Sequence, residues 1–94
     1  MAEFTVQLTQ PAVHDIRLIP GDLQSAIKDG IMGLRQDPLP SPPLKKKLKG
    51  FGFPIYRLRI ADYRILYRID QKTITIIRII NRKDPERAIR HLKM

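Results

Sequence analysis

Arginine is the residue type whose positions in this sequence point most directly to chemistry. If residues 61–62 form a two-residue turn between two strands, Arg59 lies directly opposite Arg64. Arg57 and Arg68 then lie on the same side of the hairpin. Like charges placed opposite each other destabilise a sheet, so this cluster indicates a missing anion. Phosphate suits arginine, whose planar fork donates two hydrogen bonds and keeps its charge when partly buried. The alternative is a solvated outer face of the sheet.

Other basic residues are candidates for the same phosphate-binding surface. Arg82 and Lys83 approach the same edge of the sheet if the last strand lies beside the strand before it. Arg78 is ambiguous, because a one-residue change in the preceding turn moves it from the basic face to the core face. The lysine run that ends at Lys49 is expected to be a solvated helix or loop surface. A single strand of nucleic acid that enters a basic cleft would still be attracted to this run.

The overall charge agrees with a polyanionic partner. The 94 residues contain 18 lysines and arginines against 9 aspartates and glutamates, which gives a formal net charge of +9. Such an imbalance is expected for a protein that binds nucleic acid or an acidic protein. The sequence has no glycine-rich phosphate loop and no HExxH motif, and His14 and His91 lack the spacing of metal ligands. It therefore predicts no metal and no other cofactor.

Length and cysteine content restrict the class of protein. A chain of 94 residues is expected to form one domain over residues 1–94. The absence of cysteine excludes disulfides and a thiolate nucleophile, and it allows a cytoplasmic location. The first residues resemble no signal peptide, and Arg78 interrupts the longest apolar run, residues 76–80. We therefore expect a cytoplasmic protein that does not enter a membrane.

The first third of the chain predicts a strand and two helices. Apolar residues alternate with polar ones over residues 4–8, which is typical of a half-buried strand. Apolar residues at helical spacing predict a helix over 11–19, which a Pro-Gly pair ends. A second helix is expected over 22–36, with Asp22 as its N-cap, although its two internal glycines each cost about 1 kcal/mol of helix propensity.

The remainder of the chain predicts the sheet that positions the arginines. Residues 37–44 are rich in proline and are expected to form a surface loop. Residues 56–60, 63–69 and 73–80 are rich in β-branched and aromatic types and predict an antiparallel meander. A short last helix is expected from Asp84. The expected fold is α+β, ordered β-α-α-β-β-β-α, with two N-terminal helices packed on one face of a small, twisted, mainly antiparallel sheet.

Three segments of the second half carry a recognisable pattern: LKG from residue 48, YRLRIADYRILYRID from residue 56, and IIRIINRKDPER from residue 76. This pattern resembles the RelE family of toxin ribonucleases, which typically read KLKG, YRLRVGDYRVIY and VGHRKDVYR. The resemblance covers about residues 44–90, whereas the N-terminal part agrees only in its strand-helix-helix order. The hairpin motif is typical of the RelE/ParE superfamily, and it does not separate the ribonuclease branch from the gyrase-inhibiting branch.

The resemblance implies a toxin that cleaves mRNA, usually in the ribosomal A site, by activating a ribose 2′-hydroxyl to attack the adjacent phosphate without a metal. Arg57 and Arg59 correspond by position to basic residues of the family's second-strand motif. Arg64 corresponds to the arginine of the third-strand motif, and Arg82 to that of the closing motif. These residues would hold the scissile phosphate and neutralise the charge that develops on it. A cognate acidic antitoxin of the RelB type would hold the toxin silent.

The closing segment departs from the family pattern where a proton acceptor is expected. Asn81 stands where many members have histidine, and Glu86 stands where many have tyrosine. Glu86 is the candidate general base, but neighbouring arginines should lower its pKa and weaken it as a base at neutral pH. A glutamate at the start of a helix is also explained by the helix dipole alone. His91 is the next candidate.

Three functions are compatible with these features. The leading hypothesis is a ribosome-dependent mRNA endoribonuclease. The second is a ParE-like toxin that inhibits DNA gyrase by binding, without chemistry of its own. The third is a degenerate member that binds only an antitoxin or nucleic acid. Phosphate-facing arginines together with a proton acceptor would favour the first hypothesis over the second.

Overall fold

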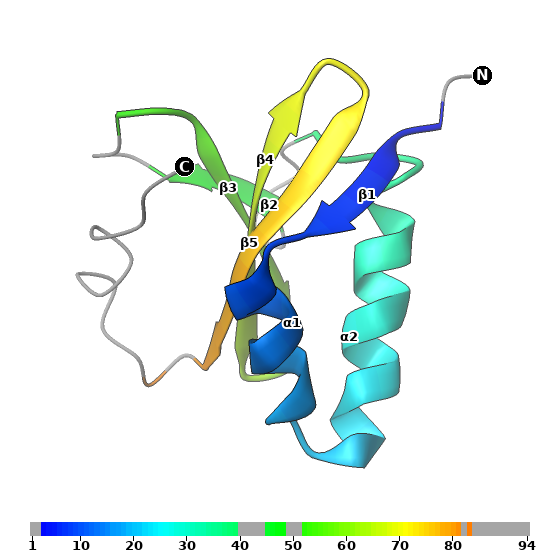
Figure 1. Ribbon diagram of the computed structural model, residues 1–94, viewed down its shortest axis with the longest axis vertical. Helices are drawn as coiled ribbons and strands as arrows, with labels where there is room; N and C mark the ends of the chain where they lie inside the picture. Colours follow the sequence, from blue (N-terminus) through cyan, green and yellow to red (C-terminus); the bar gives the residue numbers. More distant parts are fainter. Residues whose placement is uncertain (1–2, 40–44, 49–51, 82, 84–94) are drawn as a thin grey trace.

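One five-stranded sheet organises the structure, in the order β1-β5-β4-β3-β2 (Figure 1). Its strands are β1 (Thr5–Leu8), β2 (Lys45–Leu48), β3 (Ile55–Ile60), β4 (Tyr63–Asp70) and β5 (Thr73–Asn81). β1 and β5 pair in parallel, and the other neighbours pair antiparallel. The computed structural model describes residues 3–39, 45–48, 52–81 and 83. The predicted α+β class and the mainly antiparallel sheet are confirmed.

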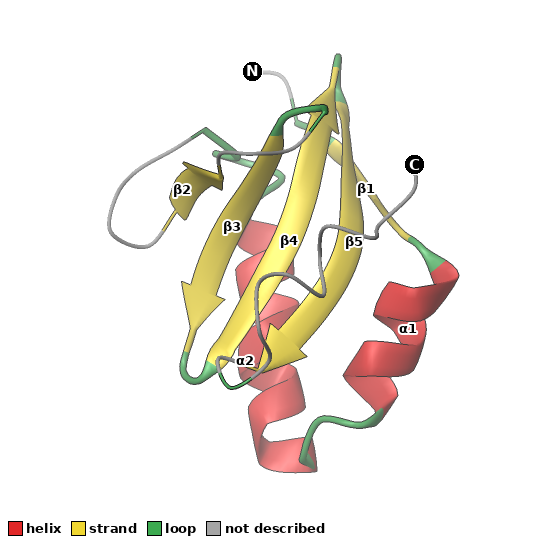
Figure 2. Ribbon diagram, turned by 90° about the vertical axis from the view of Figure 1, so that its left-hand side faces the viewer, coloured by secondary structure: helices red, strands yellow, loops and turns green. Residues whose placement is uncertain are grey.

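Two helices, α1 (Gln10–Arg17) and α2 (Gly21–Gly33), pack on one face of this sheet. Figure 2 shows α2 behind the sheet and α1 beside β1 and β5. The main core lies between the helices and the sheet. It contains buried residues of both helices, of the segments directly after them and of the three long strands: Ala12, Ile19, Ile27, Ile31, Leu34, Leu58, Ile65, Tyr67, Ile74, Ile76 and Ile79. In the part of the chain that the structure describes, no helix is long and apolar enough to cross a membrane.

The helix ends differ from the predicted ones by a few residues. The carboxamide Nε2 of Gln24 donates to the carbonyls of Ile16 and Ile19, at 3.0 and 2.9 Å, which satisfies carbonyls at the end of α1. The prediction of Asp22 as the N-cap of the second helix is wrong. Pro20 holds that position in an extended conformation, and Asp22 lies in the first turn. A carboxylate there still interacts favourably with the helix dipole.

Helix α2 approaches β3 closely at Gly30. A Cβ atom added to Gly30 would collide with the Cδ1 atom of Ile60. A larger residue here would force the Ile60 side chain to move, so glycine allows this close approach, at a cost of about 1 kcal/mol in helix propensity. This contact brings α2 onto the strand that carries Arg57 and Arg59.

The lysine run forms an edge strand, β2, so the helix or loop predicted there is wrong, whereas Lys46 and Lys47 are exposed as predicted. Lys46 pairs with Arg57 and Leu48 pairs with Ile55. Leu48 is half-buried and packs against an apolar cluster on the sheet. This packing favours a strand, while the exposed lysines discourage pairing with other chains at the sheet edge. The short helix predicted from Asp84 lies outside the described residues.

Tyr67 joins β4 to the loop that follows α2. Its ring is fully buried and stacks on Tyr56 with 5.7 Å between ring centroids. Its hydroxyl donates a 2.8 Å hydrogen bond to the carbonyl oxygen of Pro38, which is also buried. Burial raises the pKa of Tyr67 well above its usual value, so the phenol stays protonated and able to donate.

Replacing Tyr67 with Phe should lower the free energy of unfolding by about 1 to 3 kcal/mol, because the buried Pro38 carbonyl loses its donor. Urea unfolding measures this change, with Tyr56→Phe as the matched control that keeps both stacked rings. The raised pKa contributes stability that is present below about pH 10 and is lost as the pH rises further. Tyr67→Phe should therefore lose less stability than the wild type above pH 10. Equal urea midpoints for Tyr67→Phe and Tyr56→Phe would show that the Tyr67 hydroxyl contributes nothing to stability.

Candidate nucleic-acid interface

The β3–β4 hairpin presents chemically different residues on its two faces. The register places Arg59 opposite Arg64 and Arg57 opposite Leu66, as predicted from the sequence. Arg68 lies further along β4 on the same side, two and four residues beyond Leu66 and Arg64. These four arginines define a basic face, which is turned away from the helices and toward the viewer in Figure 2.

The basic face is only partly a solvated surface. Arg57 is just 8% exposed, and Arg64 is half-buried. The Nε atoms of both side chains are out of contact with solvent. Of the four arginines, only Arg59 is exposed, as all four would be if this face were simply a solvated outer surface. Because guanidinium keeps its charge when buried, Arg57 and Arg64 place positive charge at positions that packing holds in place.

An apolar cluster forms the floor of the basic face. Its buried members are Ile55, Leu66, Ile77 and Ile80, with Leu48 and Phe53 packed against them. The guanidinium of Arg68 lies over the ring of Phe53, 5.7 Å from its centroid, in a cation–π contact. Low polarity beside the arginines strengthens their interaction with an anion, because the field is less screened than in water.

A hollow of about 270 Å³ lies at the turn end of the hairpin. Arg59 and Arg64 both line it, together with Ala61, Asp62 and Tyr63. Ala61 has a φ of 51°, in the left-handed region that favours glycine, so the turn is held in a conformation that alanine adopts at a cost. The turn thus sets two cationic side chains around one space large enough for a phosphate group.

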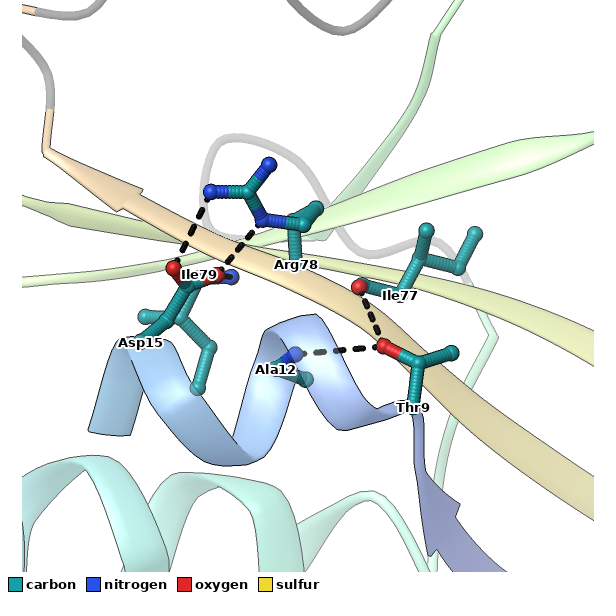
Figure 3. Close-up of polar contacts among 6 residues, drawn as sticks. All are labelled: Thr9, Ala12, Asp15, Ile77, Arg78 and Ile79. Carbon is teal, nitrogen blue, oxygen red and sulfur yellow. Dashed lines mark hydrogen bonds and ion pairs between the residues drawn. The ribbon is translucent and has the colours of Figure 1, made fainter. Parts of the chain in front are cut away.

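Arg78 is tied to helix α1. Its Nε and Nη2 atoms donate to the carboxylate of Asp15 at 2.7 and 3.0 Å (Figure 3). A register shift in β5 at Leu66 and Tyr67 sets Arg78 opposite Leu66, which is the side of the basic face. Of the two faces that the sequence allowed for Arg78, the register selects the basic face, and the side chain has a structural partner on α1. Its contact with RNA stays a prediction.

Asp15 is the charged residue that the sequence reasoning missed. Its carboxylate also accepts a 2.9 Å hydrogen bond from the backbone N–H of Ile79, and the residue is buried. Thr9, the N-cap of α1, donates its hydroxyl to the carbonyl of Ile77 at 2.7 Å (Figure 3). Side chains of α1 thus continue the pairing of the β5 edge beyond the end of β1. The signal was available, because Asp15 is three residues after the apolar Ala12 at helical spacing.

Of the other predicted site residues, Lys83 alone belongs to the part of the chain that the structure describes. Lys83 is exposed just beyond β5, and its backbone N–H donates to the Asn81 side chain at 3.0 Å. Predicted site residues Arg82, Glu86 and Lys49 lie outside the described residues, as does His91. His14 is exposed on α1, as expected for a surface histidine.

Replacing Asp15 with Ala should lower the free energy of unfolding by about 1.5 to 3 kcal/mol, because a charge-assisted hydrogen-bond acceptor is removed from the edge of β5. Chemical denaturation followed by circular dichroism measures the loss. Asp29→Ala, at an exposed position on α2, is the matched control and should change stability by less than about 0.5 kcal/mol. If both variants unfold at the same denaturant concentration, α1 does not depend on Asp15 for its attachment to the sheet.

Solved structures share this fold. The RelBE2 toxin–antitoxin complex of Mycobacterium tuberculosis matches with a TM-score of 0.74 at 28% identity, covering 84% of this chain and 98% of that chain. The RelE–RelB complex of the archaeon Pyrococcus horikoshii also gives 0.74, at 24% identity, covering 88% of this chain and 99% of the other. The second comparison, at its low identity, establishes the fold alone.

Sequence comparisons extend the match to relatives and to a family. Toxin RelG of Mycobacterium tuberculosis is 33% identical over 85 residues, which covers 86% of this chain and 93% of that toxin. The family model of the ParE toxin of the type II toxin–antitoxin system parDE matches residues 6–85. The match spans β1 to beyond β5 and so includes the entire basic face. The chain therefore belongs to the ParE toxin family, within the RelE/ParE superfamily of type II toxin–antitoxin toxins.

Proposed function

We propose that this toxin is an endoribonuclease that cleaves mRNA on the ribosome. The observation that carries the proposal is the cross-strand pair Arg59 and Arg64 around one hollow, with the buried Arg57 on the same face. Two guanidinium groups placed opposite each other concentrate positive charge at one point of the sheet, which favours binding of a phosphodiester. The likeness to Toxin RelG and to RelE toxins supports this branch of the superfamily.

In the proposed reaction the ribose 2′-oxygen attacks the adjacent phosphorus, and the bond from phosphorus to the 5′-oxygen breaks. The products are a 2′,3′-cyclic phosphate and a 5′-hydroxyl. Arg57, Arg59 and Arg64 hold the nonbridging oxygens and stabilise the charge that grows on them in the transition state. The apolar floor that includes Leu66 lowers the polarity beside these arginines, which increases the effect of each charge.

Proton transfer requires a group other than these arginines, since arginine does not give up its proton in a protein. Glu86 is the proposed general base, at the position where related toxins carry tyrosine. Arg82 in the closing segment is proposed to stabilise the leaving oxygen, which takes its proton from water to become the 5′-hydroxyl. Lys49, Arg68, Arg78 and Lys83 are proposed to contact the RNA backbone on either side. No metal or cofactor takes part in this mechanism.

We further expect an acidic antitoxin as the partner that silences the toxin. The formal charge of +9 favours an acidic segment that folds on the basic face and blocks it. Structures of related toxins were solved as complexes with RelB antitoxins. Such a toxin would act in the cytoplasm, where its ribosomal target lies.

A second candidate function is inhibition of DNA gyrase by binding. The match to the ParE family model over residues 6–85 favours it. In that case the basic face would be a docking surface, and no step would need a proton acceptor. The two functions predict different effects when a single guanidinium is removed. A docking surface spreads its binding energy over many contacts, so one loss has a small effect, whereas loss of a transition-state contact lowers the rate of cleavage strongly.

Replacing Arg64 with Ala should reduce cleavage of ribosome-bound mRNA by about 100-fold or more, since one transition-state contact is typically worth a few kcal/mol. Arg64→Lys keeps the charge but not the planar fork and should retain a fraction of the activity. Arg17→Ala, the same change at an exposed position on α1, should cleave like the wild type. Circular dichroism on the same preparations checks the fold. Cleavage by folded Arg64→Ala at the wild-type rate would exclude Arg64 from the mechanism.

Replacing Glu86 with Gln should lower the single-turnover cleavage rate by about 100-fold to 10,000-fold, with little change in ribosome binding, because Gln keeps the shape but cannot accept the proton. If Glu86 only interacts with a helix dipole, the change costs about 0.3 to 1 kcal/mol of stability and leaves the rate within a few-fold. Full activity of Glu86→Gln would move the base to His91.

A further inference from the structure

We infer that the groove between β1, β5 and β4 is a subsite for one nucleobase of the mRNA next to the cleaved phosphate, and that Gln7 helps to set the base preference there. This inference rests on the proposed function. The groove has a volume of about 640 Å³, more than twice that of the hollow around Arg59 and Arg64. It lies at the end of the basic face opposite to the hollow around Arg59 and Arg64.

Sheet register makes the groove continuous with the basic face. Arg68 pairs with Thr75 across β4 and β5, and Thr75 pairs with Gln7 across β5 and β1. Residues paired across neighbouring strands have side chains on the same face, so all three share the side that carries Arg64. Arg68 belongs to the basic face and also lines the groove, and four residues of strand rise place it about 13 Å from Arg64 along β4. A single strand of RNA that places a phosphate at Arg64 can therefore extend into the groove.

The groove offers hydrogen-bonding groups of both kinds. Gln7 donates its Nε2 proton to the hydroxyl oxygen of Thr75 at 2.9 Å, which fixes the carboxamide. Among the described residues, nothing donates to the Gln7 carboxamide oxygen and nothing accepts the Thr75 hydroxyl proton. An acceptor and a donor thus stand side by side on strands, where their positions are set by the sheet. Side-chain amides and hydroxyls of this kind read the edges of unstacked bases.

Charge argues for a neutral ligand group in this groove. Arg68 lines it together with Asp70, whose carboxylate lies 3.9 Å from the Arg68 guanidinium. Asp70 balances the charge of Arg68 in the groove, whereas two arginines outnumber Asp62 in the hollow at the hairpin turn, so the groove attracts a phosphate less strongly than that hollow does. Arg68 is backed by the Phe53 ring, and a flat guanidinium held in this way is a surface on which a base can stack. The basic face would therefore hold phosphates, while the groove would recognise a base.

The test maps cleavage sites of the full-length toxin on ribosomes that hold mRNAs with randomised codons, by sequencing the new 5′ ends. Gln7→Met keeps the size of the side chain and removes its hydrogen bonds, and Gln10→Met is the matched control at an exposed position outside the groove. The wild type and Gln10→Met should share a base preference at each position. Gln7→Met should weaken that preference about fivefold or more at one position and leave the others unchanged. Thr75→Val should affect the same position.

The outcomes separate this inference from the proposed function. If the wild type and Gln7→Met cleave with identical preferences, the subsite is wrong and the endoribonuclease proposal stands. If Gln7→Met is folded by circular dichroism, keeps its preferences and binds the antitoxin more weakly, the groove holds the protein partner, which also overturns the subsite. If the wild type leaves every mRNA intact, the endoribonuclease proposal and the subsite fall together.

Discussion

The two-residue turn at Ala61 and Asp62 is the constraint on which the functional surface depends. It pairs Arg59 with Arg64 and so decides which side chains of β3 and β4 share a face. Because side chains alternate along a strand, a shift of one residue would send the arginines into the helix-packed core. The apolar residues on the opposite face oppose such a shift, since Leu58 and Ile65 are buried there beneath α2. The core and the basic face are thus specified by the same register.

The second support of the basic face comes from helix α1. β1 pairs with β5 only as far as Ile76, and beyond that point side chains of α1 satisfy the edge of β5. Asp15 thereby attaches α1 to the end of β5, from which the closing segment with Arg82 and Lys83 continues. Burying a carboxylate is costly unless it is paired, and Arg78 supplies the pair. A residue that looks like a phosphate ligand in the sequence therefore also has a structural task.

Much of the fold and of the arginine cluster followed from the sequence, because both depend on local pattern. Alternating apolar residues and a two-residue turn were enough to predict the pairing of Arg59 with Arg64. The missed features depend on distant contacts. The lysine run forms strand β2, in which Leu48 packs against an apolar cluster that includes Leu66, Ile77 and Ile80 of later strands. The Asp15–Arg78 pair joins residues 63 positions apart, and the register shift in β5 that aims Arg78 has no local signature.

The basic face is proposed to perform chemistry on mRNA and to be more than a docking surface. Purified toxin added to translating ribosomes, followed by primer extension, tests it directly beside a gyrase supercoiling assay with the same preparation. The proposal predicts new mRNA ends inside the ribosome-bound codon and unchanged supercoiling by gyrase. Intact mRNA together with inhibited supercoiling would contradict it, and would show that the arginines of β3 and β4 serve binding alone.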